Sequence, residues 1–335
     1  MITNSASGIA ALVLGPVVVA VVGAGLGLLY LGIDRKLVAH MQGRVGPPII
    51  QPFRDVEKLL MKENIMPDGA IPWLFKIAPI LCVMGSAALL LYIPLLGQQA
   101  LFEGSGDVML VVYLLLIPSL ALVVAGFASG SPFATVGSQR EMVLMIGYEF
   151  PLSVVVVAVA WRILPIADAN AFALSTIAAH PIWNSVGPLG IVGALILLFV
   201  LLFVTPGELG KVPFDLAEAE TELAGGLLVE YSGRNLALFY IANAVRAFAM
   251  LSLVVALFFP YNLSPLIGIG ASAPAVIIDA LFFLLKVFLV MFISVVLIRS
   301  AMARFKITQA SKFYLVTMTL VSLAGLMLIW IDAII

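Results

Sequence analysis

The sequence has few of the residues that proteins use to bind metals, nucleotides or nucleic acids. Its 335 residues include one cysteine and two histidines, which are Cys82, His40 and His180. This supply cannot ligate an iron–sulfur cluster or build a Cys/His zinc site within the chain. The formal net charge of −1 gives no support to nucleic acid as a partner. Glycine-rich nucleotide fingerprints and nucleophile elbows are also missing, so any redox chemistry would take place in another subunit.

Charged residues are scarce too, at 10% of the chain against about a quarter in soluble domains. Hydrophobic residues make up 63% of the chain and form runs long enough to cross a bilayer. We therefore predict an all-α integral membrane protein, a single polytopic domain over residues 1–335. Its eight predicted transmembrane helices cover Gly8–Leu31, Trp73–Leu96, Val108–Ser129, Glu141–Ile163, Val186–Thr205, Asn235–Pro260, Pro274–Ile298 and Phe313–Ile334.

The charges between the spans predict the orientation in the membrane. The connections after spans one, three, five and seven hold 13 Lys and Arg residues, whereas the opposite connections hold only Arg162. The positive-inside rule therefore places the charged loops in the cytoplasm and both termini outside the cell membrane. These cytoplasmic loops are predicted at about 32–72, 130–140, 206–234 and 299–312.

Two local patterns add detail to this layout. Gly23 and Gly27 form a GxxxG in the first span, where another helix could approach closely. We expect that span to be permanent and not a signal peptide. In the first loop, Phe53, Val56 and Leu60 share one helical face with charged residues around the other. Residues 51–63 are too few to span a bilayer, so the pattern predicts a short amphipathic helix at the membrane surface.

Acidic residues concentrate between Thr205 and Gly233. This stretch holds six of the 18 acidic residues of the chain, which are Glu208, Asp215, Glu218, Glu220, Glu222 and Glu230. If Pro213 opens a helix, Asp215, Glu218 and Glu222 share one face and repel one another. Core packing does not call for such an arrangement. The stretch is therefore either an ordinary solvated acidic loop or a set of carboxylates that relays charge.

Basic residues also occur inside the predicted spans. Arg246 and Lys286 lie near the middle of their spans, where a basic side chain costs about 2.5 to 3.5 kcal/mol. Asp279 lies two turns before Lys286, and Glu149 lies about two turns into the fourth span. These four residues either form ion pairs that tie helices together or continue a hydrated polar path from the acidic stretch into the membrane.

Two stretches resemble a known family. They are PFDLAEAETELAGGLLVEYSG at 213–233 and GSQREMVLMIGYEFPLS at 137–153. Both closely resemble the membrane-anchor subunit shared by respiratory complex I and the membrane-bound nickel–iron hydrogenases, and the likeness covers almost the whole chain. In that family the anchor lies between a soluble redox arm and antiporter-like membrane subunits within the lipid bilayer.

The resemblance assigns roles to individual positions. It implies a chain of carboxylates at Glu149, Glu218, Glu220, Glu222 and Glu230, with Asp215 and Glu208 at its mouth. We group Arg246, Asp279 and Lys286 with these carboxylates as the predicted proton or ion path. Arg140 and Glu141 would lie at the cytoplasmic entrance near the redox partner, and Arg44 and Arg54 of the first loop would belong to the same interface.

The first loop departs from the pattern of the quinone-using enzymes. Complex I anchors usually carry Gly-Pro-Asn and then a longer insertion, whereas this chain has Arg-Val-Gly-Pro-Pro at 44–48 and continues to Gln51 and Pro52. The short form resembles the hydrogenase branch. In that branch the nickel–iron centre and the iron–sulfur clusters belong to the large and small soluble subunits, and this chain binds no cofactor or metal alone.

We therefore expect a non-catalytic, ion-translocation-coupling anchor subunit that links redox chemistry in a soluble arm to proton or sodium transport. A sulfur-reducing relative of the hydrogenases fits the same pattern. A second hypothesis is a quinone-binding anchor of a complex I-type enzyme that oxidises NADH or reduced coenzyme F-420. A third, from another class, is a freestanding secondary transporter that uses the intramembrane charges to bind its substrate.

Overall fold

The computed structural model describes residues 6–102, 107–167, 172–268 and 273–335, and these residues form helices and no strands. In chain order the elements are α1 (Ala6–Met41), α2 (Gln51–Met61), α3 (Pro72–Tyr92), α4 (Val108–Ala128), α5 (Pro132–Ala167), α6 (Leu174–Ala179), α7 (Ile182–Ser185), α8 (Pro188–Glu208), α9 (Glu220–Leu223), η2 (Gly226–Leu228), α10 (Gly233–Phe258), α11 (Ser264–Ile267), α12 (Ala273–Met291), η3 (Phe292–Leu297), α13 (Ile298–Ala301), α14 (Ile307–Lys312), η4 (Phe313–Met318) and α15 (Thr319–Ile334). The segments η3 and η4 are single π-helical turns that continue the α-helices on either side of them.

Eight of these helical stretches are long and apolar enough to cross a membrane, which confirms the predicted number of spans. All four predicted cytoplasmic loops are shorter than expected, because α1 continues to Met41, α5 begins at Pro132, α8 ends at Glu208 and α14 begins at Ile307. Lys, Arg, Gln and Glu are good helix formers, so the helices continue past their apolar runs. Arg140, which was predicted to lie in a loop, therefore lies on α5 together with Glu141.

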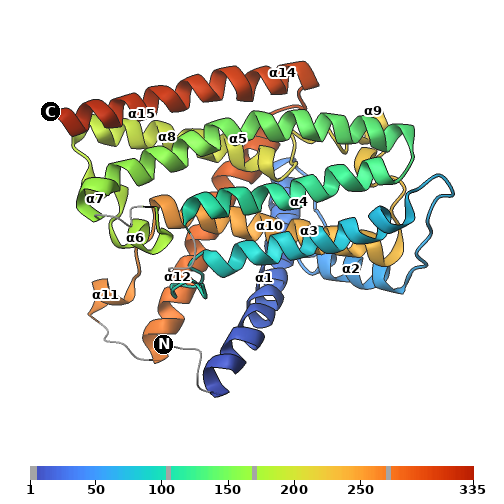
Figure 1. Ribbon diagram of the computed structural model, residues 1–335, viewed down its shortest axis with the longest axis horizontal. Coiled ribbons are helices and arrows are strands. Elements are labelled where there is room, and N and C mark those ends of the chain that lie inside the picture. The colour runs from blue at the N-terminus through green and yellow to red at the C-terminus, as the bar shows by residue number, and fades with distance from the viewer. Residues whose placement is uncertain (1–5, 103–106, 168–171, 269–272) are drawn as a thin grey trace.

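The helix α10 lies at the centre of the bundle and is buried along nearly its whole length. The helices α1, α2, α3 and α12 all contact it. Figure 1 shows α3, α4, α5, α8 and α15 running side by side, while α1 and α12 cross them steeply. We call the end of the bundle that carries α2 and α9 the charged end. The end that carries α6, α7 and α11 is the opposite end.

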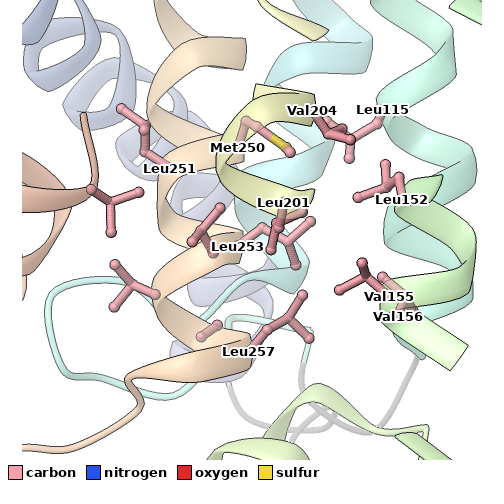
Figure 2. Close-up of a cluster of buried hydrophobic side chains, with 14 of the residues drawn as sticks. Leu115, Leu152, Val155, Val156, Leu201, Val204, Met250, Leu251, Leu253 and Leu257 are labelled. Carbon is pink, nitrogen blue, oxygen red and sulfur yellow. The ribbon is translucent and has the colours of Figure 1, made fainter. Parts of the chain in front are cut away.

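A layer of apolar side chains fills the bundle between α4, α5, α8 and α10. Figure 2 shows this layer, which is drawn with Leu115, Leu152, Val155, Val156, Leu201, Val204, Met250, Leu251, Leu253 and Leu257. The labelled side chains are all buried and carry neither charge nor hydrogen-bonding groups. The close packing of these side chains excludes water from the layer itself.

The predicted surface helix is present as α2 and packs against α10 and α1. Val56 is buried, and Phe53 and Leu59 pack beside it against Leu28 of α1. The prediction was wrong for Leu60, whose side chain is 49% exposed. Three residues after Val56, Leu59 completes the helical face that the neighbouring helices cover.

The two glycines of the GxxxG lie where α1 crosses its neighbours, as predicted. A Cβ atom on Gly23 would meet the side chain of Leu90, and one on Gly27 would lie 2.2 Å from the backbone oxygen of Ala244 in α10. A carbonyl oxygen in a helix backbone cannot move aside as a side chain can. Gly27 therefore allows α1 and α10 to touch backbone to backbone.

Replacing Gly27 tests this contact. We expect Gly27→Ala to lower the free energy of unfolding by about 1–3 kcal/mol, because the new methyl group forces α1 away from α10. The measurement is the thermal unfolding midpoint of the purified protein in detergent. Gly25→Ala is the matched control, since a Cβ atom there would meet no neighbouring element within 4 Å. Equal midpoints for the two variants would show that the close crossing does not limit stability.

Candidate functional site

A buried arginine forms the centre of the candidate site. Arg246 lies halfway along α10, with 2% of its surface exposed. Its Nη1 donates a hydrogen bond to Oγ of Ser119 in α4 at 2.7 Å. The same Oγ lies 3.3 Å from the hydroxyl oxygen of Tyr148 in α5. Three helices thus contribute one polar group each to a connected set in the interior.

Two buried carboxyl groups lie within electrostatic range of this arginine. They belong to Glu208, at the end of α8, and Glu141, in the first third of α5. Glu208 is 1% exposed and Glu141 is 6% exposed. Neither carboxyl oxygen of Glu208 has a hydrogen-bond partner among the described residues. We call Ser119, Glu141, Tyr148, Glu208 and Arg246 the polar cluster.

This placement corrects two expectations. Glu208 was expected at the mouth of the carboxylate chain and Glu141 at the interface with a soluble arm. Both side chains are instead buried inside the helix bundle, because α5 and α8 extend further toward the charged end than the apolar runs indicated.

The acidic segment, residues 205–233, reaches the polar cluster through a small cavity of about 50 Å³. A polar cavity of this size has room for a few water molecules. Its ionisable and amide-bearing lining residues are Glu141, Lys211, Asp215, Glu218, Asn243 and Arg246. Two carboxyl groups from the acidic segment and one carboxyl group from a helix therefore face the same small cavity as the arginine.

Burial changes the proton affinities of the loop groups around this cavity. It raises the pKa of Glu218 to about 7, and the nearby Asp215 adds to this rise. Burial also raises the pKa of Asp215, although the Arg304 guanidinium opposes the shift. The pKa of Lys211 is lowered because burial disfavours its charged form. Near neutral pH, Glu218 can thus both hold and release a proton.

No helix begins at Pro213, so the condition under which Asp215, Glu218 and Glu222 would share one face is not met. Residues 209–219 form an irregular segment, followed by the short α9. The buried Phe214 anchors the segment, with its ring packed against the rings of Phe305, Phe313 and Tyr314. These aromatic partners follow from tertiary packing against the last span, so the local sequence pattern could not indicate them.

Two ion pairs hold the acidic segment on the helices. Arg304 Nη2 lies 2.8 Å from Oδ2 of Asp215, and Arg140 Nη1 pairs with Oε2 of Glu222. Arg140 comes from α5, whereas Arg304 comes from the connection between α13 and α14. Arginines from two separate parts of the chain thus hold the acidic segment in place.

The remaining acids of the segment do not enter the cavity. Glu220 and Glu222 are exposed, and Glu230 is partly exposed. Because the predicted helix is absent, Glu222 does not share a face with Asp215 and Glu218. The acidic stretch therefore divides into inner acids that face Arg246 and surface acids at the charged end.

Glu149 lies one residue after Tyr148 on α5, at the edge of the bundle. Its Oε1 is buried without a hydrogen-bond partner among the described residues, and its carboxyl group interacts electrostatically with Glu208. Its helical neighbours Ile146 and Phe150 are 49% and 55% exposed. Glu149 thus connects the interior to a side of the bundle that other membrane components can reach.

The structure does not bring Asp279 and Lys286 to this site. Asp279 Oδ1 accepts hydrogen bonds from the backbone N–H groups of Leu263 and Ser264, at 3.0 and 2.8 Å. Lys286 Nζ donates to the carbonyl oxygens of Phe259 and Tyr261. Both side chains form hydrogen bonds with the connection between α10 and α12, at the opposite end of the bundle.

The predicted interface residues lie at the charged end. Arg44 follows α1 and is exposed, and Arg54 lies on the exposed face of α2. Next to them, Asp34 and Arg35 of α1 form ion pairs with Arg299 and Asp55, both at 2.9 Å. The charged end therefore presents a fixed array of paired and unpaired basic groups.

Several polar residues of the site were missed from the sequence, among them Ser119, Lys211, Asn243 and Arg304. Ser119 and Arg304 gave no signal, because a single serine in an apolar span and a basic residue in a loop are both common. Asn243 did give one, since it lies three residues before Arg246 and shares its helical face. Its Oδ1 is buried without a hydrogen-bond partner among the described residues.

The acidic residues of the site do not gather in the manner of metal ligands. In the described parts of the chain, no three His, Cys, Asp or Glu side chains come together in a way that could hold a metal ion. The polar cluster consists of carboxyl groups, hydroxyl groups and one guanidinium.

Comparison with known proteins finds relatives along most of the chain. The family described as NADH dehydrogenase matches residues 14–330. "Hydrogenase-4 component C" of Escherichia coli is 34% identical over 78% of this chain and 79% of that protein. A subunit of the NADH-quinone oxidoreductase of Brevibacillus brevis is 35% identical over 68% of this chain and 66% of that protein.

A solved structure shares the fold as well. One subunit of the membrane-bound sulfane sulfur reductase, an archaeal respiratory membrane complex, superimposes with a TM-score of 0.80 at 27% sequence identity. The match covers 94% of this chain and 98% of that subunit. The arrangement of helices is therefore common to subunits of more than one kind of respiratory complex.

The pKa of Glu218 gives a prediction for pH dependence. Between its ordinary value of 4.5 and about 7, the folded protein keeps a proton that the unfolded chain releases. Stability should thus fall as pH rises across this window and then level off. In Glu218→Gln, the difference in thermal midpoint between pH 5 and pH 8 should be smaller than in the wild type.

Infrared spectroscopy checks the same proton directly. The wild type should lose a protonated carboxyl band as pH rises through about 7. That band should be missing in Glu218→Gln and unchanged in Glu220→Gln, whose substituted side chain is exposed. A band that persists in Glu218→Gln would assign the titration to another acid.

Proposed function

This chain belongs to the NADH dehydrogenase family, and from that membership we propose that it is the membrane-anchor subunit of a multisubunit nickel–iron hydrogenase related to complex I. It couples a redox reaction in a soluble arm to the movement of protons or sodium ions. The observation that carries this proposal is the polar cluster around Arg246, which is buried in the bundle and connected to the acidic segment by a polar cavity.

The relatives support the proposal that this chain works as part of a complex and not as a freestanding protein. One relative is named as a component of a hydrogenase, one as a subunit of a quinone oxidoreductase, and the structural neighbour comes from a sulfane sulfur reductase. The named proteins differ in their substrates, but each is named as part of an oxidoreductase. We place the nickel–iron centre and the iron–sulfur clusters in large and small soluble subunits, and antiporter-like subunits beside this chain in the bilayer.

The charged end is the side on which we place the soluble arm. Arg44 and Arg54 are exposed there, and the ion pair of Arg140 with Glu222 lies at the same end. The positive-inside rule assigns this end to the cytoplasm and both termini to the outside. A redox partner docked here would lie directly above the acidic segment.

The side chains then form a relay for charge. Glu218 takes up a proton at the cavity, because its pKa of about 7 allows both states near neutral pH. Glu141 and Glu208 line the interior next to Arg246, whose fixed positive charge stabilises one ionised carboxylate at a time. Glu149 follows at the edge of the bundle and passes charge to a neighbouring membrane subunit.

The apolar layer below the polar cluster gives the relay its direction. Its labelled side chains cannot carry a proton or coordinate an ion (Figure 2). Charge that enters at the charged end therefore leaves sideways at Glu149, and the charge movement that stores energy takes place in the adjoining subunits. This arrangement supports a coupling subunit and argues against a freestanding transporter, which needs a route through its own chain.

Redox chemistry can act on the relay through the two ion pairs that hold the acidic segment. A change of charge near Arg140 or Arg304 alters how firmly Glu222 and Asp215 are held. A shift of the segment changes the distance of Glu218 from the polar cluster and thereby its proton affinity. Each elementary charge that crosses the membrane stores about 2.3 kcal/mol per 100 mV.

A quinone-binding anchor is the second candidate, favoured by the similarity to quinone oxidoreductase subunits. It requires a cavity for an apolar tail beside the first loop. The small polar cavity and a larger one at the opposite end of the bundle are both lined by residues outside α1 and α2. Quinone-site inhibitors should then leave hydrogen evolution by the complex unchanged, and inhibition would favour the quinone-binding anchor.

The relay is tested by removing its most buried acid. In Glu208→Gln we expect the rate of ion movement in inverted membrane vesicles to fall at least about tenfold, because the side chain can no longer release a proton. Hydrogen evolution by the soluble arm should change much less. Ion movement is followed by a pH-sensitive dye for protons and by a radioactive tracer for sodium.

Glu220→Gln is the matched control, because it removes an exposed acid from the same segment. It should pump as the wild type does. Wild-type pumping in Glu208→Gln, or an equal loss of pumping and hydrogen evolution in an intact complex, would contradict the relay.

A further inference from the structure

A larger cavity lies away from the proposed relay. Its volume is about 270 Å³, and it is enclosed by the connection after α3, by α6, by the end of α10 and by α12. Small-molecule sites usually measure about 300–1,000 Å³, so this cavity fits a small group and not a whole quinone. Figure 1 shows α6 and α12 toward the opposite end of the bundle.

The lining of the cavity is amphipathic. Its polar side chains come from Gln98, Gln99, Ser175, Asn262 and Lys286. Its apolar wall includes Tyr92, Phe102, Leu174, Val255 and Phe283. Gln98 and Gln99 are exposed, so the cavity opens to the surface between them and the buried wall of α10. A ligand with a polar group next to an apolar part matches this surface.

Lys286 supplies the charge of the cavity. Its Nζ donates to the carbonyl oxygens of Phe259 at 2.8 Å and Tyr261 at 2.7 Å, and it lies 5.0 Å from the centre of the Phe282 ring. An ammonium group has three N–H donors, so one remains for a ligand. The two carbonyl bonds hold the ammonium in a fixed position at the cavity wall.

This ammonium has no anionic partner within ion-pair distance among the residues that the structure describes. The acid on the same helical face, Asp279, receives its hydrogen bonds from Leu263 and Ser264. A basic group in a membrane span is costly without compensation, and two carbonyl dipoles compensate only part of a full charge. The remaining charge favours an anion in the adjacent space.

We propose that this cavity binds a phosphate group, with the ammonium of Lys286 as its charged ligand and the amide of Gln98 or Asn262 as a further donor. The phosphate belongs either to the phosphodiester of a membrane phospholipid or to a soluble phosphate. The apolar wall formed by α10 and α12 accommodates the glycerol and the first acyl carbons of a lipid. The site is independent of the relay, so its test does not require redox activity.

The test measures binding to the full chain, purified in detergent with its associated subunits and freed of lipid. Phosphatidylglycerol, diacylglycerol and inorganic phosphate are titrated separately, and the shift of the thermal midpoint gives the apparent affinity. Phosphatidylglycerol should raise the midpoint, whereas diacylglycerol, which lacks the phosphate, should not. In Lys286→Gln the apparent affinity for phosphatidylglycerol should fall at least about tenfold, as expected for one lost charge-assisted hydrogen bond.

Two further variants separate binding from folding. Lys76→Gln removes an exposed lysine elsewhere and should bind as the wild type does. Ala178→Phe fills the cavity without altering Lys286 and should also abolish binding. A shift by inorganic phosphate that depends on Lys286 would identify a soluble phosphate as the ligand. Wild-type affinity in Lys286→Gln or in Ala178→Phe would overturn the proposal.

Discussion

The arrangement of this protein depends on a full positive charge, on Arg246, in the middle of a helix that is buried on all sides. A guanidinium in an apolar interior is costly unless hydrogen bonds and opposite charge compensate it. Ser119 provides one hydrogen bond, and the carboxyl groups of Glu141 and Glu208 lie within electrostatic range of the guanidinium. Compensation thus draws α4, α5 and α8 around α10 and fixes where the polar cluster can lie.

The acidic segment is subject to a related constraint at the charged end. The half-buried carboxyl groups of Asp215 and Glu218 gain from staying near Arg246 but repel each other, and only Asp215 has its own arginine. The outcome is two neighbouring acids in different surroundings. Burial raises the pKa of both, but the Arg304 guanidinium opposes the rise at Asp215, whereas the neighbouring Asp215 adds to the rise at Glu218.

Hydropathy alone predicted the eight spans, and the loop charges indicated which end carries the basic residues. The acids of the site were predicted as a group, but only some reach the interior. What separates Glu218 from Glu222 is the path of an irregular segment, and that path follows from Phe214 packing against rings of the last span and of Phe305 just before it. Ser119 and Arg246 are similarly far apart in sequence, at a separation of 127 residues. Contacts of this kind leave no local pattern, so sequence periodicity could not assign them.

The apolar layer of Figure 2 also bears on how such a complex is built. Polytopic subunits enter the membrane one at a time, and a newly inserted copy exists for a while without neighbours. Since its interior is sealed with hydrocarbon side chains beyond the polar cluster, a solitary copy stays electrically insulating. If the chain is the coupling subunit proposed above, such an intermediate would not discharge the membrane potential, and conduction would begin only when a second subunit completes the route.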